Sequence, residues 1–195
     1  MIAREIVRKI VELLERESMD YMVVGGIASM HHAVPRFTKD ADFVVAAPSA
    51  ALEKVLEKLP PEFTVDPQAR MELFTGTMRW VIEVRGTVYK IEFFLLGGDQ
   101  HHLEEFKRRQ RVWLPLIERE TWLATAEDMI VQKLRWARPQ DVADVTDILS
   151  VSRGALDFPY IEKWCREHKT WERLQDIRRS VEESLTPPKV PPPDL

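Results

Sequence analysis

The hydrophobic and polar positions in the first third of the chain predict helices that alternate with strands. Residues 2–17 carry apolar side chains at helical spacing and charges on the opposite face. Residues 50–59 predict a second helix, with Ser49 as its N-cap. Short apolar runs rich in β-forming residues predict strands at 21–24, 43–46 and 63–65. This part of the chain is therefore expected to combine both kinds of element.

The middle of the chain is rich in β-forming residues. Three strands are predicted there, at residues 71–75, 79–84 and 87–96. Arg85-Gly86 is a tight-turn signal, so the last two strands are expected to form a hairpin. Residues 100–111 predict a charged helix or loop, and alternating apolar residues at 113–122 predict one more strand and a turn.

Helical patterns fill the last third of the chain. Thr125 is a predicted N-cap with acids in the turn after it, and the helix that it starts is expected to end before Pro139. Three further helices are predicted, at residues 140–149, 157–168 and 170–185. The proline-rich residues 186–195 predict an extended or disordered tail.

Composition limits the class of protein. The 195 residues are enough for one core or for a core with a small helical annex, and 45% hydrophobic with 31% charged residues indicates a soluble globular chain. A net charge of −4 gives no overall attraction to nucleic acid or to an anionic membrane. Cys165 has no cysteine partner in the chain, and the first residues lack the apolar segment of a signal peptide. We therefore expect a cytoplasmic protein.

Candidate chemistry begins at Gly25-Gly26, between a predicted strand and a predicted helical turn. A helix N-terminus presents free N–H groups, and glycines allow a phosphate to approach the backbone. Asp40 and Asp42 then open the next apolar run, and strand alternation places both carboxylates on one side. Paired carboxylates suit Mg²⁺, which binds through one or two of them together with substrate phosphates. These residues favour phosphoryl or nucleotidyl transfer.

The order Gly-Gly, short helix, then Asp-x-Asp opening a strand resembles the nucleotidyltransferase superfamily, whose core is that of DNA polymerase β. The segment from His32 to Asp42 resembles the branch that holds bacterial abortive-infection toxins and related small nucleotidyltransferases, with Ala33 where that branch often has glycine. The resemblance implies an α/β (α+β) fold. It implies a core with a mixed β-sheet flanked by helices over residues 1–123, and a C-terminal helical region at 124–185 that packs on the core.

The same resemblance calls for a third carboxylate on a neighbouring strand, as a metal ligand or general base. Glu92, inside the apolar run from Ile91 to Leu96, matches by position, although the family usually has aspartate there. An acid in so apolar a strand is expensive to bury unless it is paired or metal-bound. Glu83 is the alternative candidate, and a third possibility is that both acids are simply solvated on an edge strand.

A second motif lies in the helical region. In the related branch, a helix with a Lys-Leu pair is followed by an acidic ladder, and here Lys133-Leu134 is followed by Asp141 and Asp144. The resemblance implies that Lys133 holds triphosphate charge, and that Asp141 and Asp144 orient this lysine or contact the nucleotide. Gln140 stands where arginine is common, so a local ion pair is expected to be missing.

The resemblance therefore implies an Mg²⁺-dependent enzyme that moves a nucleoside monophosphate from an NTP to an acceptor hydroxyl and releases pyrophosphate. Two Mg²⁺ ions are expected on Asp40, Asp42 and Glu92, the catalytic acids. The other expected nucleotide-binding residues are Gly25, Gly26 and Lys133 for the β- and γ-phosphates, Arg36 and Lys39 for nearby charge, Ser29 through its hydroxyl, and Asp141 and Asp144.

The acceptor is open between a macromolecule (tRNA or protein) and a small molecule of the antibiotic type. In the first case the protein is expected to be a toxin with an antitoxin partner. A non-catalytic nucleotide-binding or partner-binding module is the third alternative. A basic cluster, formed by Lys107, Arg108, Arg109 and Arg111, either contacts an RNA backbone or is a solvated face balanced by Glu104 and Glu105. The His31-His32 and His101-His102 pairs lack a convincing set of zinc ligands.

Overall fold

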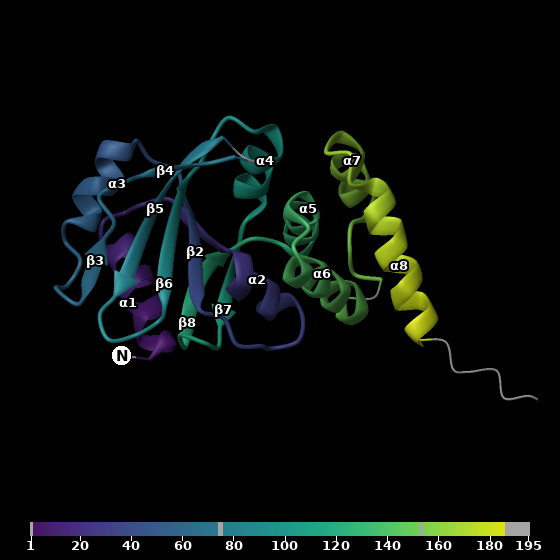
Figure 1. The fold of residues 1–195 in the computed structure, drawn as a ribbon, viewed down its shortest axis with the longest axis horizontal. Helices are drawn as coiled ribbons and strands as arrows, with labels where there is room; N and C mark the ends of the chain where they lie inside the picture. Colours follow the sequence, from purple (N-terminus) through teal and green to yellow (C-terminus); the bar gives the residue numbers. More distant parts are fainter. Residues whose placement is uncertain (1, 74–75, 153, 186–195) are drawn as a thin grey trace, which may run out of the picture.

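The computed structural model of the protein describes residues 2–73, 76–152 and 154–185. The strands of this part of the chain form one sheet in the order β3-β5-β6-β2-β1-β8-β7, and β4 pairs with β5 beside this path (Figure 1). The strands are β1 (Tyr21–Val24), β2 (Asp40–Val45), β3 (Phe63–Val65), β4 (Arg70–Glu72), β5 (Thr77–Val84), β6 (Lys90–Leu95), β7 (Gln110–Leu114) and β8 (Arg119–Leu123).

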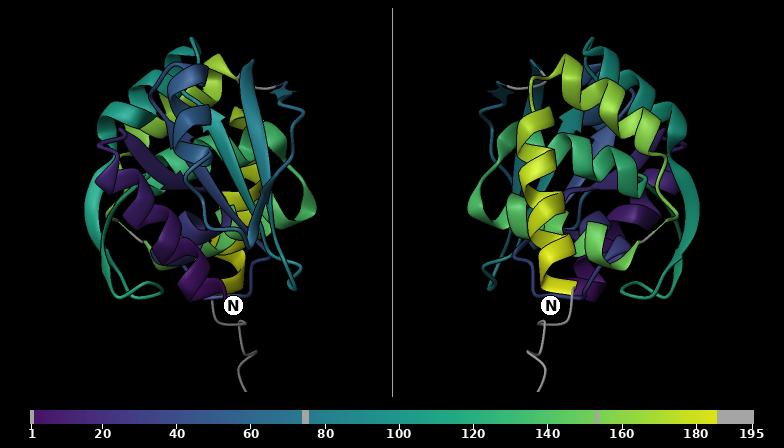
Figure 2. Two further views of the ribbon diagram at one scale, coloured as in Figure 1. Left: turned by 90° about the vertical axis from the view of Figure 1, so that its left-hand side faces the viewer. Right: turned by 90° about the vertical axis from the view of Figure 1, so that its right-hand side faces the viewer.

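Helices lie on both sides of the sheet. Figure 1 and Figure 2 show α1 and α3 on one side, and α2 with α5 to α8 on the other, where α8 is outermost. The helices are α1 (Ala3–Arg16), α2 (Gly25–His32), α3 (Ser49–Leu56), α4 (Gln100–Arg108), α5 (Ala126–Trp136), α6 (Pro139–Val151), α7 (Phe158–Glu167) and α8 (Trp171–Leu185). None of these described helices has the length and apolar character needed to cross a bilayer.

The sheet is mixed. β2 pairs with β6, and β1 with β8, in parallel, whereas β1 and β2 pair antiparallel, as do β5 and β6. In this register Asp42 stands beside Val24 on one neighbour and Glu92 on the other. Because side chains two residues apart in a strand share a face, Asp40 lies on the same face as Asp42. The three acids therefore meet at the edge where β1 ends and β2 and β6 begin.

One hydrophobic cluster holds the sheet and the helices together. The Phe43 and Phe93 rings stack at 5.3 Å between centroids in the middle of the sheet, and both side chains are fully buried. Ile10 of α1 belongs to the same cluster, as do Ile161 of α7 and Leu174 of α8. Burying a side chain of this size stabilises a fold by about 1.5–3 kcal/mol. The helices after residue 123 thus share the core of the sheet.

The predicted mixed α/β class is confirmed, and the strands at 21–24 and 63–65 have the predicted bounds. The stretch 100–111 divides between α4 and β7, and residues 110–123 form a complete hairpin rather than one strand and a turn. β6 begins at Lys90 instead of residue 87, since residues 85–89 form the turn. Predictions for residues 74, 75 and 186–195 fall outside the described chain.

Ser49 is the first residue of α3 rather than its N-cap. Pro48 holds the cap position, with φ −60° and ψ 146°. The proline ring fixes this φ, and its extended backbone ends the preceding segment without a capping side chain. The prediction of Ser49 as N-cap was wrong by one residue for this reason.

Candidate active site

The turn between β1 and α2 is built so that only glycine fits its first position. Gly25 has φ +63°, and a Cβ atom at this position would lie 1.9 Å from the Asp42 Oδ2 atom. A Cβ at Gly26 would lie 2.8 Å from the Thr38 Oγ1 atom. The absence of side chains therefore lets the N-terminus of α2 sit directly against the carboxylates of β2, with its first N–H groups free of any side-chain cap.

The two aspartates of β2 have different surroundings. Asp40 is exposed and accepts a hydrogen bond from the Thr38 hydroxyl at 2.5 Å. Burial raises the pKa of Asp42 to about 8, and the negative charges of Asp40 and Glu92 add to this rise. Near neutral pH, without a cation, Asp42 is therefore largely protonated. The positive charges of Lys133 and Arg138 oppose this rise but do not cancel it.

The three acids belong to a pocket of about 260 Å³ on the sheet side, called the carboxylate pocket. Its remaining lining is Glu72, Arg79, Phe94, Trp136 and Arg138. Among the described residues, no three His, Cys, Asp or Glu side chains are grouped so that they could hold a metal ion by themselves. Mg²⁺ commonly takes only one or two carboxylates and completes its shell with phosphates and water. Asp40 and Asp42 could therefore supply two ligands of an Mg²⁺ ion whose other ligands are phosphate oxygens and water.

Glu92, and not Glu83, is the acid that lies beside the two aspartates. Its Oε2 atom accepts a hydrogen bond from Arg79 Nη1 on β5 at 3.1 Å. Glu83 is exposed at the hairpin end and pairs with Lys90 at 3.4 Å. Glu92 therefore lies on the strand next to Asp42, and Arg79 offsets its apolar surroundings.

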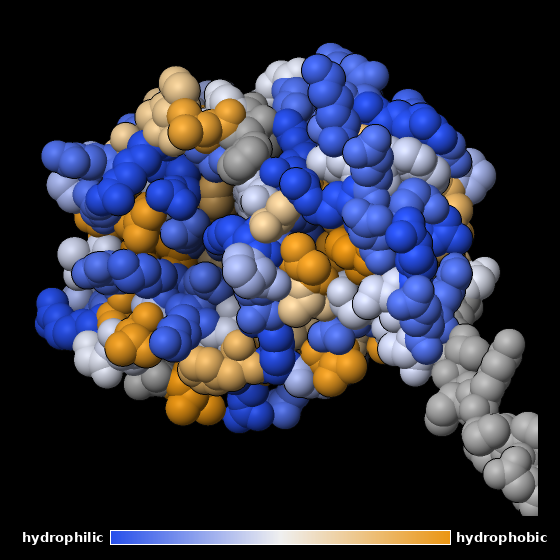
Figure 3. All heavy atoms as spheres, turned by 45° about the vertical axis from the view of Figure 1, so that its right-hand side comes forward, coloured by the Kyte–Doolittle hydropathy of each residue, from blue (hydrophilic) through white to orange (hydrophobic). Residues whose placement is uncertain are grey.

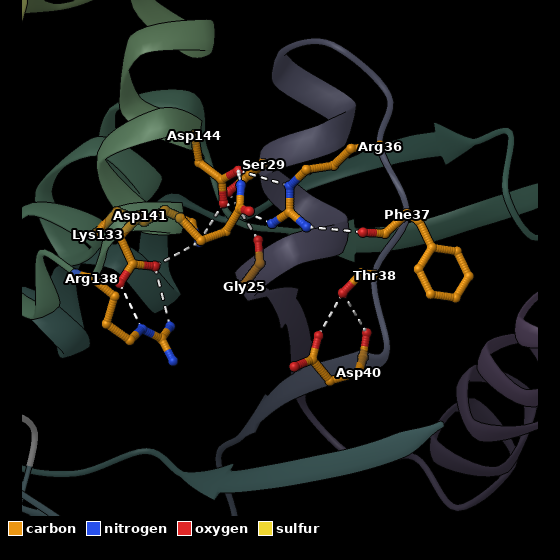
Figure 4. Close-up of polar contacts among 11 residues, drawn as sticks. Gly25, Ser29, Arg36, Phe37, Thr38, Asp40, Lys133, Arg138, Asp141 and Asp144 are labelled. Atoms are coloured by element: carbon orange, nitrogen blue, oxygen red, sulfur yellow. Dashed lines mark hydrogen bonds and ion pairs between the residues drawn. The ribbon is translucent and has the colours of Figure 1, made fainter. Parts of the chain in front are cut away.

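The acidic ladder of α6 is enclosed by cations from three segments (Figure 4). The Lys133 Nζ atom lies 3.1 Å from Asp141 and 2.7 Å from Asp144, and all three side chains are buried. Arg36 donates two hydrogen bonds to Asp144, at 2.8 and 2.9 Å. Arg138 donates to Asp141 at 2.7 and 3.2 Å. We call these five residues the cation cluster.

The two aspartates of the cation cluster are firmly ionised. Burial would raise the pKa of Asp141, but hydrogen bonds and charge from Arg138 and Lys133 outweigh it and lower that pKa. The pKa of Asp144 is lowered in the same way by Arg36 and Lys133. Gln140 also donates to Asp144 at 3.0 Å. The ion pair expected to be missing at position 140 is thus made by Arg36, from a distant segment.

A second pocket, of about 590 Å³, lies on the helical side and is called the glycine pocket. Gly25, Gly26, Arg36, Lys39 and Arg138 are among its lining residues. It shares Asp40, Asp42, Trp136 and Arg138 with the carboxylate pocket. The N-terminus of α2, which can bind an anion, therefore lies next to Asp40 and Asp42, which favour a cation.

Ser29 lies apart from both pockets. Its side chain is buried in α2, and its hydroxyl donates a hydrogen bond to the Gly25 carbonyl at 3.0 Å. Lys39, by contrast, is exposed at the glycine pocket. Of the predicted nucleotide-binding residues, Lys39 is therefore open to a ligand, while Ser29 supports the helix turn behind the glycines.

Glu72, Arg79, Trp136 and Arg138 line the carboxylate pocket although none of them is a predicted site residue. A signal for Arg79 exists in the sequence. A two-residue turn at Arg85-Gly86 would place Arg79 directly opposite Glu92. In the observed register Arg79 pairs with Phe94 and Val81 with Glu92, so the ion pair is diagonal.

The basic cluster at 107–111 is largely occupied by acids. Arg108 pairs with Glu127 and Asp128, while Arg109 pairs with Asp20. Arg111 pairs with Glu15 and Glu120. The predicted balancing acid Glu105 is instead buried and accepts a hydrogen bond from Gln132. Figure 3 shows hydrophilic residues over most of the helical side, with small hydrophobic groups toward the centre of that face.

His101 is the fully buried member of its pair. Its ring lies 3.2 Å from Asp128, which also accepts hydrogen bonds from Thr125 and Tyr160. This network joins α4, α5 and α7. Burial lowers the pKa of His102 to about 4.

Three solved structures share the fold of this protein. The structure resembles the antibiotic-resistance factor ANT(2'')-Ia, with TM-score 0.55 and 15% identity over 93% of this chain and 94% of that one. It also resembles the lincosamide antibiotic adenylyltransferase LnuA, with TM-score 0.52 and 12% identity over 77% and 98%. An antigenic nucleotidyltransferase-like protein from Paracoccidioides brasiliensis gives TM-score 0.51 and 13% identity over 92% and 91%.

No curated protein shows significant sequence similarity to the chain. Residues 4–183 match the family described as "Nucleotidyltransferase of unknown function (DUF6036)". That match spans the sheet, the glycine turn, the carboxylates and the cation cluster. The fold neighbours include antibiotic nucleotidyltransferases, as the sequence resemblance implies. The chain therefore belongs to this family of nucleotidyltransferases.

Proposed function

We propose that this protein is a divalent-metal-dependent nucleotidyltransferase that moves a nucleoside monophosphate from an NTP to an acceptor hydroxyl. The observation that carries the proposal is the contact between Gly25 and Asp42. It brings a free helix N-terminus and a cation-demanding acid pair within one site. A triphosphate needs the first feature, and transfer of its α-phosphoryl group needs the second.

The glycine pocket is the proposed seat of the triphosphate. The N–H groups at the start of α2 face the β- and γ-phosphates, and the glycines permit close approach. Lys39 adds an exposed positive charge at the rim. Arg36 lines this pocket and is held by Asp144, whereas Ser29 lies outside it and supports the turn through the Gly25 carbonyl.

Asp40 and Asp42 are the proposed holders of the divalent ions, with Glu92 beside them. A bound Mg²⁺ supplies charge neutralisation to the triphosphate and lowers the pKa of the acceptor hydroxyl. Glu92, released from Arg79, accepts the acceptor proton. The acceptor oxygen then forms a bond to the α-phosphorus, while the bond from the α-phosphorus to the bridging oxygen breaks. Pyrophosphate leaves with that electron pair.

A small hydroxyl compound is our proposed acceptor, ahead of tRNA or protein. The carboxylate pocket has about 260 Å³, and its lining includes four acids and two arginines. The basic cluster is largely paired with acids, which leaves little charge there for a nucleic-acid backbone. Among the neighbours, LnuA has been solved with bound lincomycin and ANT(2'')-Ia in complex with adenylyl-2''-tobramycin. A toxin role and an antitoxin partner stay predictions from the sequence.

A non-catalytic nucleotide-binding module is the second candidate, favoured by the ion pair that occupies Glu92. One experiment separates the two. The protein is incubated with Mg²⁺, each α-labelled NTP and a cell extract split into small-molecule, RNA and protein fractions, beside the Asp40→Asn/Asp42→Asn double variant. Label entering one fraction with wild type alone supports transfer and identifies the acceptor class. NTP binding without label in any fraction supports the module, and no NTP binding overturns both.

A further inference from the structure

Lys133, the cation that the sequence resemblance assigns to the triphosphate, lines the glycine pocket but is almost entirely buried. Lys133 is 3% exposed at its side chain, and its ammonium group lies between Asp141 at 3.1 Å and Asp144 at 2.7 Å. Two ionised carboxylates more than balance its single positive charge. Two of its three N–H donors are directed at these carboxylates, and a side chain that is 3% exposed leaves a phosphate oxygen little access to the third.

Arg138 is the accessible member of the same cluster. Its side chain is 66% exposed, and it lines both the glycine pocket and the carboxylate pocket. A guanidinium has five N–H donors, and the bonds to Asp141 at 2.7 and 3.2 Å use two of them. Donors therefore remain for a ligand while Asp141 holds the group in position.

The chain turns sharply to place Arg138 there. α5 ends at Trp136, and Ala137 takes the left-handed conformation with φ 51°. Arg138 is then extended, and its own N–H donates to the Asp141 carboxylate at 3.1 Å. Its guanidinium lies over the Trp136 ring, 5.2 Å from the centroid. A non-glycine residue in this conformation is strained by roughly 1–2 kcal/mol, so the surrounding contacts must hold it.

The position of Arg138 fits a bridging ligand. It feels the charges of Asp40 and Asp42 on one side and faces the glycine turn on the other. A triphosphate that reaches from the helix N-terminus to the acid pair passes this boundary. Arginine matches phosphate oxygens through two parallel N–H donors, which a buried ammonium cannot do.

We propose that Arg138 binds the triphosphate directly, whereas Lys133 is a positioning residue that acts through Asp141. The proposal rests on the nucleotidyltransferase function given above and deepens it. Lys133 fixes Asp141 from the core side, and Asp141 fixes Arg138 at the pocket side. Asp141 therefore links the two cations: the buried Lys133 fixes its position, and Asp141 in turn fixes the position of the exposed Arg138.

The test is equilibrium binding by calorimetry, with ATP, inorganic tripolyphosphate and AMP, each with Mg²⁺. Arg138→Gln is expected to weaken ATP and tripolyphosphate binding by the same factor, about 10- to 100-fold, and to leave AMP binding unchanged. Arg138→Lys keeps the charge and is expected to recover part of the loss. Arg166→Gln is the matched control, because Arg166 is 58% exposed, pairs with Glu162 and lies over Trp171.

Two results would overturn the proposal. The first is that Arg138→Gln binds tripolyphosphate as tightly as wild type. The second applies if Arg138→Gln does not fold: it is that Arg138→Lys binds tripolyphosphate as tightly as wild type. Failure of wild type itself to bind Mg²⁺ with ATP or tripolyphosphate would instead overturn the proposed function.

Lys133→Gln tests the positioning role through salt dependence. It is expected to weaken tripolyphosphate binding. The slope of log affinity against log salt concentration should stay at the wild-type value, because Arg138 still makes the ion pair with the phosphate. Arg138→Gln is expected to flatten that slope, since one phosphate contact is lost. Flattening by Lys133→Gln and not by Arg138→Gln would assign the contact to the lysine and reject the proposal.

Discussion

Asp42 and Glu92 stand side by side on the parallel strands β2 and β6. Burial, with the added charges of Asp40 and Glu92, raises the pKa of Asp42 to about 8. The carboxyl therefore binds a proton in the free protein at neutral pH and must release it when a cation arrives. Ion binding and proton release are coupled at this one residue.

Divalent-ion affinity is expected to rise with pH because of this coupling. Between pH 6 and 8 the ion displaces the Asp42 proton, so affinity should increase by up to about tenfold per pH unit and level off above about pH 8. Calorimetry with Mn²⁺ in two buffers of different ionisation enthalpy measures both affinity and released protons. Asp42→Asn should bind weakly with no such slope, and a flat wild-type profile would contradict the prediction.

Asp42→Asn is expected to stabilise the free protein, and more so at high pH. The folded pKa of Asp42 lies above its unfolded value of 3.8, so the folded state binds the extra proton and wild-type stability falls as pH rises from about 4 to about 8. Asparagine does not ionise. Urea unfolding at pH 5 and pH 8 should show a gain at pH 8 of about 1 kcal/mol or more. An equal gain at both pH values would disprove the cause given.

Gly25→Ala is expected to destabilise the protein by about 3 kcal/mol. The added Cβ would meet the Asp42 carboxylate at 1.9 Å, and φ is +63°. Gly86→Ala is the matched control, since Gly86 has φ +75° but no atom within 4 Å of an added Cβ. The control should lose only about 1–2 kcal/mol through backbone strain. Equal losses by urea unfolding would show that the contact with Asp42 is unimportant.

Lys133→Met is expected to lower stability by about 3 kcal/mol, because it leaves Asp141 and Asp144 buried with one cation fewer. Lys163→Met serves as its control. Lys163 is exposed and pairs with Glu104 at 3.3 Å, so the expected loss is below about 1 kcal/mol. Thermal unfolding of both variants decides the matter, and similar midpoints for the two would count against a buried cation cluster.

Arg79→Gln is expected to strengthen Mn²⁺ binding by about two- to fivefold. The substitution removes a positive charge from the carboxylate pocket and frees Glu92 from its ion pair, whose strength at this exposure is at most about 1 kcal/mol. Electron paramagnetic resonance of free Mn²⁺ measures the affinity. Weaker binding in the variant would mean that Arg79 orients Glu92 for the ion instead of competing with it.

The local parts of the site could be predicted from the sequence. Gly25 and Gly26 follow from the need for a tight strand-to-helix turn, and Asp40 and Asp42 follow from strand alternation. Both rules act over a few residues, so no knowledge of distant packing is required. The structure places these residues together.

The pairing of side chains within the cation cluster could not be predicted in the same way. Arg36 and Asp144 are 108 residues apart, and their pairing depends on α6 packing against α2. A Lys-Asp motif on neighbouring helices also says nothing about burial, and Lys133 is buried where α5 packs against α6 and its two aspartates. The nearness of Arg79 to Glu92 could be predicted only with the register of the hairpin. That register depends on the length of the turn, which the sequence leaves open.

The Arg36–Asp144 ion pair ties the segment beside the glycine turn to α6, a helix that is synthesised after the whole sheet. A ribosome-bound chain that has emerged only to residue 123 already contains the glycine turn and the three acids. It lacks Asp144, which anchors the segment between α2 and β2 through Arg36, and it lacks Arg138. In such a chain the carboxylates of Asp40, Asp42 and Glu92 are already close together, but the loop that carries Arg36 has no partner on α6. On the proposed function, transfer is therefore expected only after α6 has been synthesised and has packed against α2.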